Sequence, residues 1–93
     1  MVTIDGIQFD RARYDRDADV LYLAAGDPAR ARDFDGTPEG HHVWYDERGR
    51  LIGVTFVGAA DLLRREGRLS FTEPLGAVSH SVEAGTLAGV LAA

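Results

Sequence analysis

The sequence contains no cysteine, no lysine and no asparagine. Without cysteine, the chain can form neither a disulfide framework nor a thiolate zinc site, and nothing points to an oxidising compartment. All ten basic residues are arginine, a bias that a GC-rich genome explains without any need for the guanidinium group. No apolar run approaches the roughly 20 residues of a membrane-spanning helix, and the first residues lack the basic region of a signal peptide. We therefore expect a cytoplasmic protein that does not associate with membranes.

Positive charge is not concentrated in any part of the chain, whose net charge is −5. Residues 1–35 hold eight aspartates and five arginines, residues 36–72 hold five acidic and five basic residues, and residues 73–93 add two glutamates. Proteins that bind nucleic acid usually carry a basic patch or stripe that neutralises phosphates. We therefore expect no nucleic-acid partner.

The clearest structural pattern covers residues 39–57. Two segments rich in β-branched and aromatic residues flank residues 46–49, Asp-Glu-Arg-Gly. This tetrapeptide is typical of a type I turn that is closed by a glycine in the left-handed region. Pairing Asp46 with Arg50 across the turn completes a β-hairpin.

In a regular hairpin with this turn, Tyr45 faces Leu51 and Trp44 faces Ile52, and alternation sorts the side chains into two faces. The expected core face carries Trp44, Ile52, Val54 and Phe56. The opposite face carries Val43, Tyr45, Leu51 and Val57. This second face is too apolar to be left entirely in water, so we expect a helix, a loop or a partner subunit to cover part of it. We therefore predict it as a protein interface.

The remaining segments predict further short elements. Residues 3–9 alternate as in a small strand pair, and residues 11–25 indicate a first hairpin around an aspartate-rich turn. Residues 29–38 are small and polar, which favours a surface loop. A short helix is expected between Gly58 and Gly67, because an acid opens it and arginines close it.

The last third of the chain predicts a strand and a second helix. Residues 68–72 alternate as an edge strand, and Ser81 is placed to cap a helix from Val82 to Leu91. We therefore predict a single α+β domain over residues 1–93. It contains an antiparallel sheet of about four to six strands, built from two hairpins and an edge strand, with a short helix after the second hairpin and a C-terminal helix.

No segment carries a strong catalytic or metal-binding pattern. The acidic cluster at residues 15–19 fails as a calcium loop, because the glycine required after its third acid is Val20. His41 and His42 are adjacent on an expected strand and so point to opposite faces. No serine lies in a Gly-x-Ser-x-Gly elbow. We therefore expect no metal, no cofactor and no catalytic residue, and the sequence favours a protein that is not an enzyme.

Two functional hypotheses follow from these observations. The first is a non-catalytic protein-interaction module, either a homodimer or bound to a small partner protein, that uses an exposed sheet edge or the predicted interface. The second is a small enzyme or ligand-binding domain with a polar site near His41 and His42. The ligand-binding residues in this second hypothesis are His41, His42, Asp15, Asp19, Glu39 and Arg50.

Two motifs give the chain a resemblance to a known family. Residues 14–22 match Tyr-Asp-x-x-Ala-Asp-x-Leu-Tyr, and residues 45–53 match Tyr-Asp-Glu-x-Gly-Arg-Leu-x-Gly. These motifs resemble those of the small bacterial and archaeal family called domain of unknown function 2283. The resemblance covers about residues 7–73 and leaves residues 75–93 as a C-terminal extension. It implies a compact antiparallel sheet with a helix on one face. Because short members of the family are often encoded near small toxin-like proteins of the RelE type, it also implies an antitoxin-like role for some of them.

Overall fold

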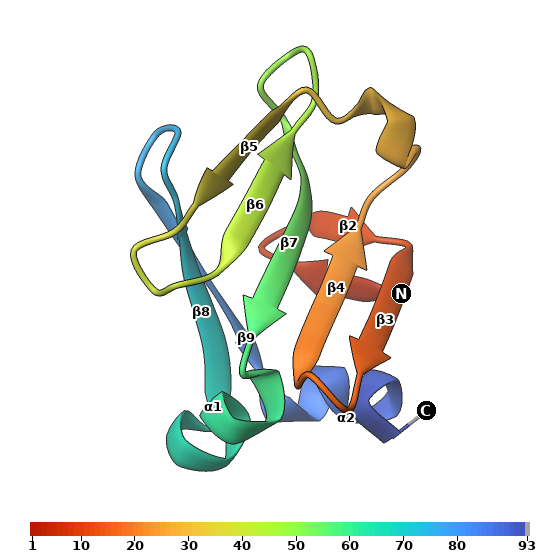
Figure 1. Ribbon diagram of the computed structural model, residues 1–93, viewed down its shortest axis with the longest axis vertical. Coiled ribbons are helices and arrows are strands. Elements are labelled where there is room, and N and C mark those ends of the chain that lie inside the picture. Colours follow the sequence, from red (N-terminus) through yellow and green to blue (C-terminus); the bar gives the residue numbers. More distant parts are fainter. Residues whose placement is uncertain (93) are drawn as a thin grey trace.

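The computed structural model describes residues 1–92, so Ala93, at the end of the predicted domain and its C-terminal extension, lies outside the described residues. Strands dominate the chain and form three antiparallel sheets, with two α-helices and a 3₁₀ turn (η1) between them (Figure 1). The predicted α+β class is therefore confirmed. The elements are β1 Val2–Ile4, β2 Ile7–Phe9, β3 Arg11–Asp15, β4 Val20–Ala24, η1 Pro28–Arg30, β5 Asp33–Gly36, β6 His42–Tyr45, β7 Leu51–Val57, α1 Ala59–Glu66, β8 Arg68–Glu73, β9 Val78–Glu83 and α2 Ala84–Ala92.

The largest sheet has five strands in the order β3-β4-β7-β6-β5. The β1–β2 hairpin and the β8–β9 hairpin form two separate two-stranded sheets. In Figure 1 both hairpins and α2 lie behind the five-stranded sheet, and no helix or strand of residues 1–92 lies over its near face. The five-stranded sheet therefore has an inner face covered by the chain itself and an outer face that the chain leaves open.

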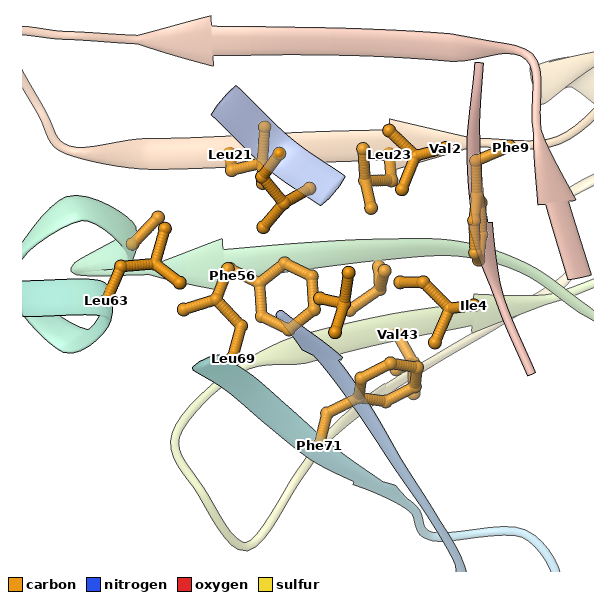
Figure 2. Close-up of a cluster of buried hydrophobic side chains, with 14 of the residues drawn as sticks. Val2, Ile4, Phe9, Leu21, Leu23, Val43, Phe56, Leu63, Leu69 and Phe71 are labelled. Atoms are coloured by element: carbon orange, nitrogen blue, oxygen red, sulfur yellow. The ribbon is translucent and has the colours of Figure 1, made fainter. Parts of the chain in front are cut away.

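Side chains alternate between the two faces of the central strands, and those on the inner face form the core. Leu21 and Leu23 on β4 and Val54 and Phe56 on β7 all point to the inner face and are fully buried. Figure 2 shows Leu21, Leu23 and Phe56 meeting side chains from the two hairpins. These partners are Val2, Ile4, Phe9, Leu69 and Phe71. Each buried side chain of this size contributes about 1.5–3 kcal/mol through removal of apolar surface from water.

The register of the β6–β7 hairpin differs from the regular one expected from its turn. Asp46 does pair with Arg50, and Tyr45 faces Leu51 as predicted. A β-bulge then makes Ile52 an extra residue, so that Trp44 faces Gly53. The prediction that Trp44 faces Ile52 is therefore wrong.

The bulge has a packing cause and exchanges the faces of β6. The ring of Trp44 lies against Gly53, where a Cβ would overlap it, so only glycine accepts this neighbour. Val43 and Tyr45 consequently join Val54 and Phe56 in the core. Trp44, which was expected in the core, lies on the outer face.

Most of the other expected elements are present, with errors at their ends. The strand pair at residues 3–9, the hairpin at residues 11–25 and the helix before Gly67 are confirmed. The largest sheet has five strands, within the four to six expected, but its edge strand is β5, and residues 68–72 pair with β9 in a separate hairpin. The segment at residues 29–38 is not only a loop, because it contains β5. Ser81 is not a helix cap: it lies in β9 opposite Ser70, and the helix begins at Ala84.

Candidate functional site

The two aspartates predicted to bind a ligand at the β3–β4 turn have structural partners instead. Asp19 has a positive φ of 56°, and its carboxylate accepts the N–H groups of Ala60 at 2.7 Å and Asp61 at 3.2 Å. It therefore caps the start of α1, about forty residues further along the chain. The hydroxyl of Tyr14 donates to the same carboxylate at 2.7 Å. Burial opposes the charge of Asp19, but these donors outweigh it and lower its pKa.

Asp15 and Arg50 also hold turns. The Asp15 carboxylate accepts the N–H groups of Asp17 and Ala18, which closes the β3–β4 turn. The Arg50 Nε donates at 2.9 Å to Asp46, whose carboxylate is only 1% exposed. Backbone N–H groups at the same turn also donate to Asp46, so its pKa is lowered although burial opposes its charge. Most polar residues of the two sequence motifs thus stabilise turns and a helix end.

The six predicted ligand-binding residues are dispersed over the molecule. Asp15 and Asp19 lie at the β3–β4 turn and Arg50 at the β6–β7 turn, at opposite ends of the five-stranded sheet (Figure 1). His42 is exposed on the outer face, opposite Thr55. Only Glu39 and His41 come together, as neighbours in one surface pocket.

That pocket has a volume of about 270 Å³ and lies between the 37–41 turn, α1 and β8. It is lined by Glu39, His41, Leu62, Glu66, Arg68 and Ser70. The Glu39 carboxylate already accepts the N–H of Thr72 at 2.9 Å and its hydroxyl at 2.6 Å. A larger hollow of about 480 Å³ between β3 and α2 is lined by none of the six predicted residues.

The chemistry of His41 is fixed by its environment. The side chain is 2% exposed, and its Nδ1 accepts the N–H of Val57 at 3.0 Å. Burial lowers the pKa of His41, so the ring is neutral near pH 7 and carries its proton on Nε2. A protonated Nε2 can donate a hydrogen bond into the pocket but can neither ligate a metal nor act as a general base. His41 therefore suits recognition of an oxygen atom, not catalysis by proton abstraction.

A second buried histidine, which the sequence analysis left without a role, lies under the β8–β9 hairpin. His80 is 7% exposed, and its Nδ1 lies 2.7 Å from Asp5 in the β1–β2 turn. Its Nε2 lies 2.5 Å from Glu73 on β8. Burial opposes a charge on the ring, but the bonds to Glu73 and Asp5 outweigh it and raise the pKa of His80. The protonated ring thus joins two hairpins that are far apart in sequence.

Within residues 1–92 no group of three or more histidine, aspartate or glutamate side chains is arranged to hold a metal ion. In the same part of the chain, no helix has both the length and the apolar character needed to span a membrane.

The outer face of the five-stranded sheet is open and carries large apolar side chains beside Arg13, His42 and Thr55. Its members alternate with the buried residues of β4, β6 and β7, with Phe34 added from β5. Phe34 is 73% exposed and stacks on Trp44, with ring centroids 6.4 Å apart. The guanidinium of Arg13 lies 4.4 Å from the ring centroid of Tyr22 at the β3 edge. We call this surface the aromatic face: Val20, Tyr22, Phe34, Trp44, Thr55 and Val57.

The outer side of the β8–β9 hairpin has the opposite chemistry. Its cross-strand pairs are Ser70 with Ser81 and Thr72 with Ser79. The hydroxyls of Thr72 and Ser79 lie 3.1 Å apart and form a hydrogen bond. We call these four residues the hydroxyl face.

The predicted interface residues are mostly inside the molecule. Val43 and Tyr45 are buried in the core, and Leu51 packs against it. The cover expected over this hairpin face is thus supplied by the chain itself. Val57, which is 44% exposed, is the member of the set that lies on the aromatic face.

No family model, no curated protein and no solved structure matches this chain.

Proposed function

We propose that the chain is a non-catalytic protein-interaction module that binds its partner through the aromatic face. The observation that carries the proposal is an open sheet face that bears stacked Phe34 and Trp44 and, on β4 and β7, Tyr22 and Val57. Single exposed apolar residues are ordinary, but a contiguous aromatic and aliphatic patch marks a binding surface. Aromatic residues also dominate the binding energy of protein interfaces.

The first hypothesis also allowed a partner to bind at an exposed sheet edge, and this mode has less support than binding on the aromatic face. All four residues of β5 are exposed at the edge of the sheet. However, the Asp35 carboxylate accepts the N–H of Gly36 at 2.8 Å, which occupies a donor that an added strand would need. Asp33 and Asp35 also place charge along this edge, a common protection against strand addition. These features favour a partner that docks on the aromatic face over one that adds a strand to β5.

The geometry of the polar residues supports the non-catalytic part of the proposal. His41 is held as a neutral donor, and both ring nitrogens of His80 are occupied by carboxylates. Asp15, Asp19 and Arg50 hold backbone turns. An antitoxin-like role, which the family resemblance implies, is one form of this proposal in which the partner is a toxin protein.

The test compares a variant on each outer face. Tagged wild type, Phe34→Asp and Ser81→Asp are used for affinity capture from nuclease-treated lysate of the source cells, and each purified chain is sedimented. We expect any near-stoichiometric partner, another protein or a second copy, to be lost with Phe34→Asp and kept with Ser81→Asp. Retention by all three chains would contradict the proposal, as would a monomer that captures nothing.

One observation favours the second hypothesis, a ligand site near His41. The pocket beside it offers the Nε2–H of His41, the Ser70 hydroxyl and Arg68, which makes no ion pair within residues 1–92. These donors suit a small carboxylate or phosphate, although the negative charges of Glu39 and Glu66, which line the same pocket, oppose an anion there. The test is ¹H–¹⁵N NMR titration with acetate and with inorganic phosphate, comparing His41→Gln with His42→Gln on the other face. Shifts around the pocket that only His41→Gln removes would support the site, and no saturable shift would exclude both ligands.

A further inference from the structure

We infer that the pocket beside His41 binds a small free amino acid and recognises both its carboxylate and its ammonium group. The inference rests on the second candidate function, the ligand site near His41, and is independent of the aromatic face. It is carried by two features of the pocket. One is a buried hydrogen-bond donor without a partner, and the other is a pair of opposite charges that do not contact each other.

The buried donor is the Nε2–H group of His41. The ring is 2% exposed, and its Nδ1 accepts the N–H of Val57, which leaves the proton on Nε2. The only fully enclosed side-chain polar atom without a partner in residues 1–92 is the Tyr45 hydroxyl, so the unpartnered Nε2 of His41 is open to the pocket that the ring lines. An oxygen atom of a ligand there would complete the hydrogen bonding of the ring.

The two opposite charges are those of Glu66 and Arg68. These residues flank Gly67, whose φ of 77° ends α1 and turns the chain into β8. Both side chains line the pocket, and neither forms an ion pair within the described part of the chain. Glu83 lies opposite Arg68 in the β8–β9 register but does not pair with it either. Each charge is therefore free to meet the opposite charge of a ligand.

The signs of the charges select the class of ligand. An anion is attracted by Arg68 but opposed by Glu39 and Glu66, whereas a cation is attracted by the two carboxylates and opposed by Arg68. Both carboxylates act on the buried ring: burial lowers the pKa of His41, and the charges of Glu39 and Glu66 oppose this decrease. A ligand with one negative and one positive group close together avoids both conflicts.

An α-amino acid carries these two groups on one carbon atom. Its carboxylate can accept hydrogen bonds from His41, Ser70 and Arg68, and its ammonium group can donate to Glu66. The half-buried Leu62 offers an apolar contact for the side chain of the ligand. The pocket volume of about 270 Å³ favours a small amino acid.

The experiment compares three probes that differ in charge. They are L-valine, N-acetyl-L-valine, which has no ammonium group, and L-valinamide, which has no carboxylate. Each probe is titrated near pH 7 into ¹⁵N-labelled wild type, Arg68→Gln and Glu66→Gln, and the amide shifts give Kd. Arg48→Gln and Asp17→Asn are the matched controls, because both residues are exposed in turns outside the pocket.

We expect L-valine to shift amides around the pocket of the wild type, with a Kd at least about tenfold below those of the other two probes. Arg68→Gln should remove the advantage of L-valine over L-valinamide. Glu66→Gln should remove its advantage over N-acetyl-L-valine. The two control variants should keep both advantages.

The outcomes separate this inference from the proposed functions. If N-acetyl-L-valine binds as tightly as L-valine, the pocket is an anion site, and the second candidate function stands without the inference. If L-valinamide binds as tightly as L-valine, the site takes a cation and the inference is overturned. If L-valine gives no saturable shift, the inference is overturned too, and the acetate and phosphate titrations decide the ligand site. Phe34→Asp, on the aromatic face, should bind L-valine as the wild type does.

Discussion

The aromatic face and the hydroxyl face are both uncovered by residues 1–92, yet they carry opposite chemistry. On the β8–β9 hairpin, residues 70, 72, 79 and 81 are serine or threonine, and Thr72 is bonded to Glu39 and Ser79. On the five-stranded sheet, the equivalent outward positions include Tyr22, Trp44 and Val57. An antiparallel sheet in water commonly keeps one polar face. The hairpin follows this pattern and the larger sheet departs from it, which supports the proposal that a partner covers the aromatic face.

This comparison implies that the two regions differ in what their residues stabilise. Residues of the β8–β9 hairpin and its bonded partners stabilise the fold of one chain. On the proposed function, exposed residues of the aromatic face contribute little to that fold and much to association. The following substitutions test this separation, in decreasing order of their effect on the free energy of unfolding.

His80→Ala on the hairpin should lower the free energy of unfolding by about 2–4 kcal/mol near pH 7. The substitution leaves Glu73 largely buried without its charged partner, and breaking a buried pair from one side is strongly destabilising. Urea unfolding measures the effect. A loss below about 1 kcal/mol would show that His80 does not join the two hairpins.

The pH dependence of the same site has a definite sign. The pKa of His80 is raised in the folded chain, so its contribution is complete below the unfolded value of about 6.5. That contribution is lost as the pH rises through the folded pKa. Urea midpoints should therefore fall between neutral and alkaline pH in the wild type and change less in His80→Gln. If the urea midpoints of both chains changed equally with pH, the raised pKa of His80 would be contradicted.

Gly53→Ala should lower the free energy of unfolding by about 1–3 kcal/mol, because the new Cβ overlaps the Trp44 ring and forces it to move. Gly36→Ala is the matched control on β5, where the nearest atom to the new Cβ is the His41 carbonyl oxygen at 3.9 Å. Denaturation measures both variants. A neutral Gly53→Ala would show that Trp44 does not lie against this position.

Asp19→Ala should cost about 1–2 kcal/mol, because two N–H groups at the start of α1 lose their acceptor. Asp17→Ala, in the same turn, leaves these bonds in place and should change the unfolding free energy by less than about 0.5 kcal/mol. Hydrogen exchange at Ala60 and Asp61 reports the loss locally. Equal effects of the two variants would return Asp19 to the set of candidate ligand-binding residues.

Phe34→Ala should change the free energy of unfolding by less than about 0.5 kcal/mol, since the ring is mostly exposed. Its effect on association should be the largest of the series, because the ring forms one end of the aromatic face. Sedimentation and urea unfolding of the same sample separate the two effects. A stability loss as large as that of His80→Ala would erase the distinction between the regions.

The sequence predicts the elements that depend on local signals. The turn at residues 46–49, the aspartate-rich turn of the first hairpin and the alternation around Leu69 are visible in a few neighbouring residues, and these elements are confirmed. The β6–β7 bulge is not visible in this way, because it follows from the contact of Trp44 with Gly53. That single shift moves Val43 and Tyr45 into the core and Trp44 onto the surface.

The polar contacts join residues that lie even further apart in the sequence. Asp19 caps a helix about forty residues away, and His80 meets Asp5 across almost the whole chain. The sequence identifies each residue as polar or titratable but does not identify its partner. β5 was missed for a related reason: its polar residues show no apolar alternation, and its pairing with β6 alone makes it a strand.

The most direct test of the aromatic face uses Trp44, the only tryptophan of the chain. Acrylamide quenching of its fluorescence is measured across a concentration series, alongside the sedimenting mass. If the face is the contact surface between two copies, quenching falls as the mass rises from monomer to dimer, and Phe34→Asp keeps Trp44 accessible throughout. A dimer in which Trp44 stays as accessible as in the monomer would show that association uses another surface.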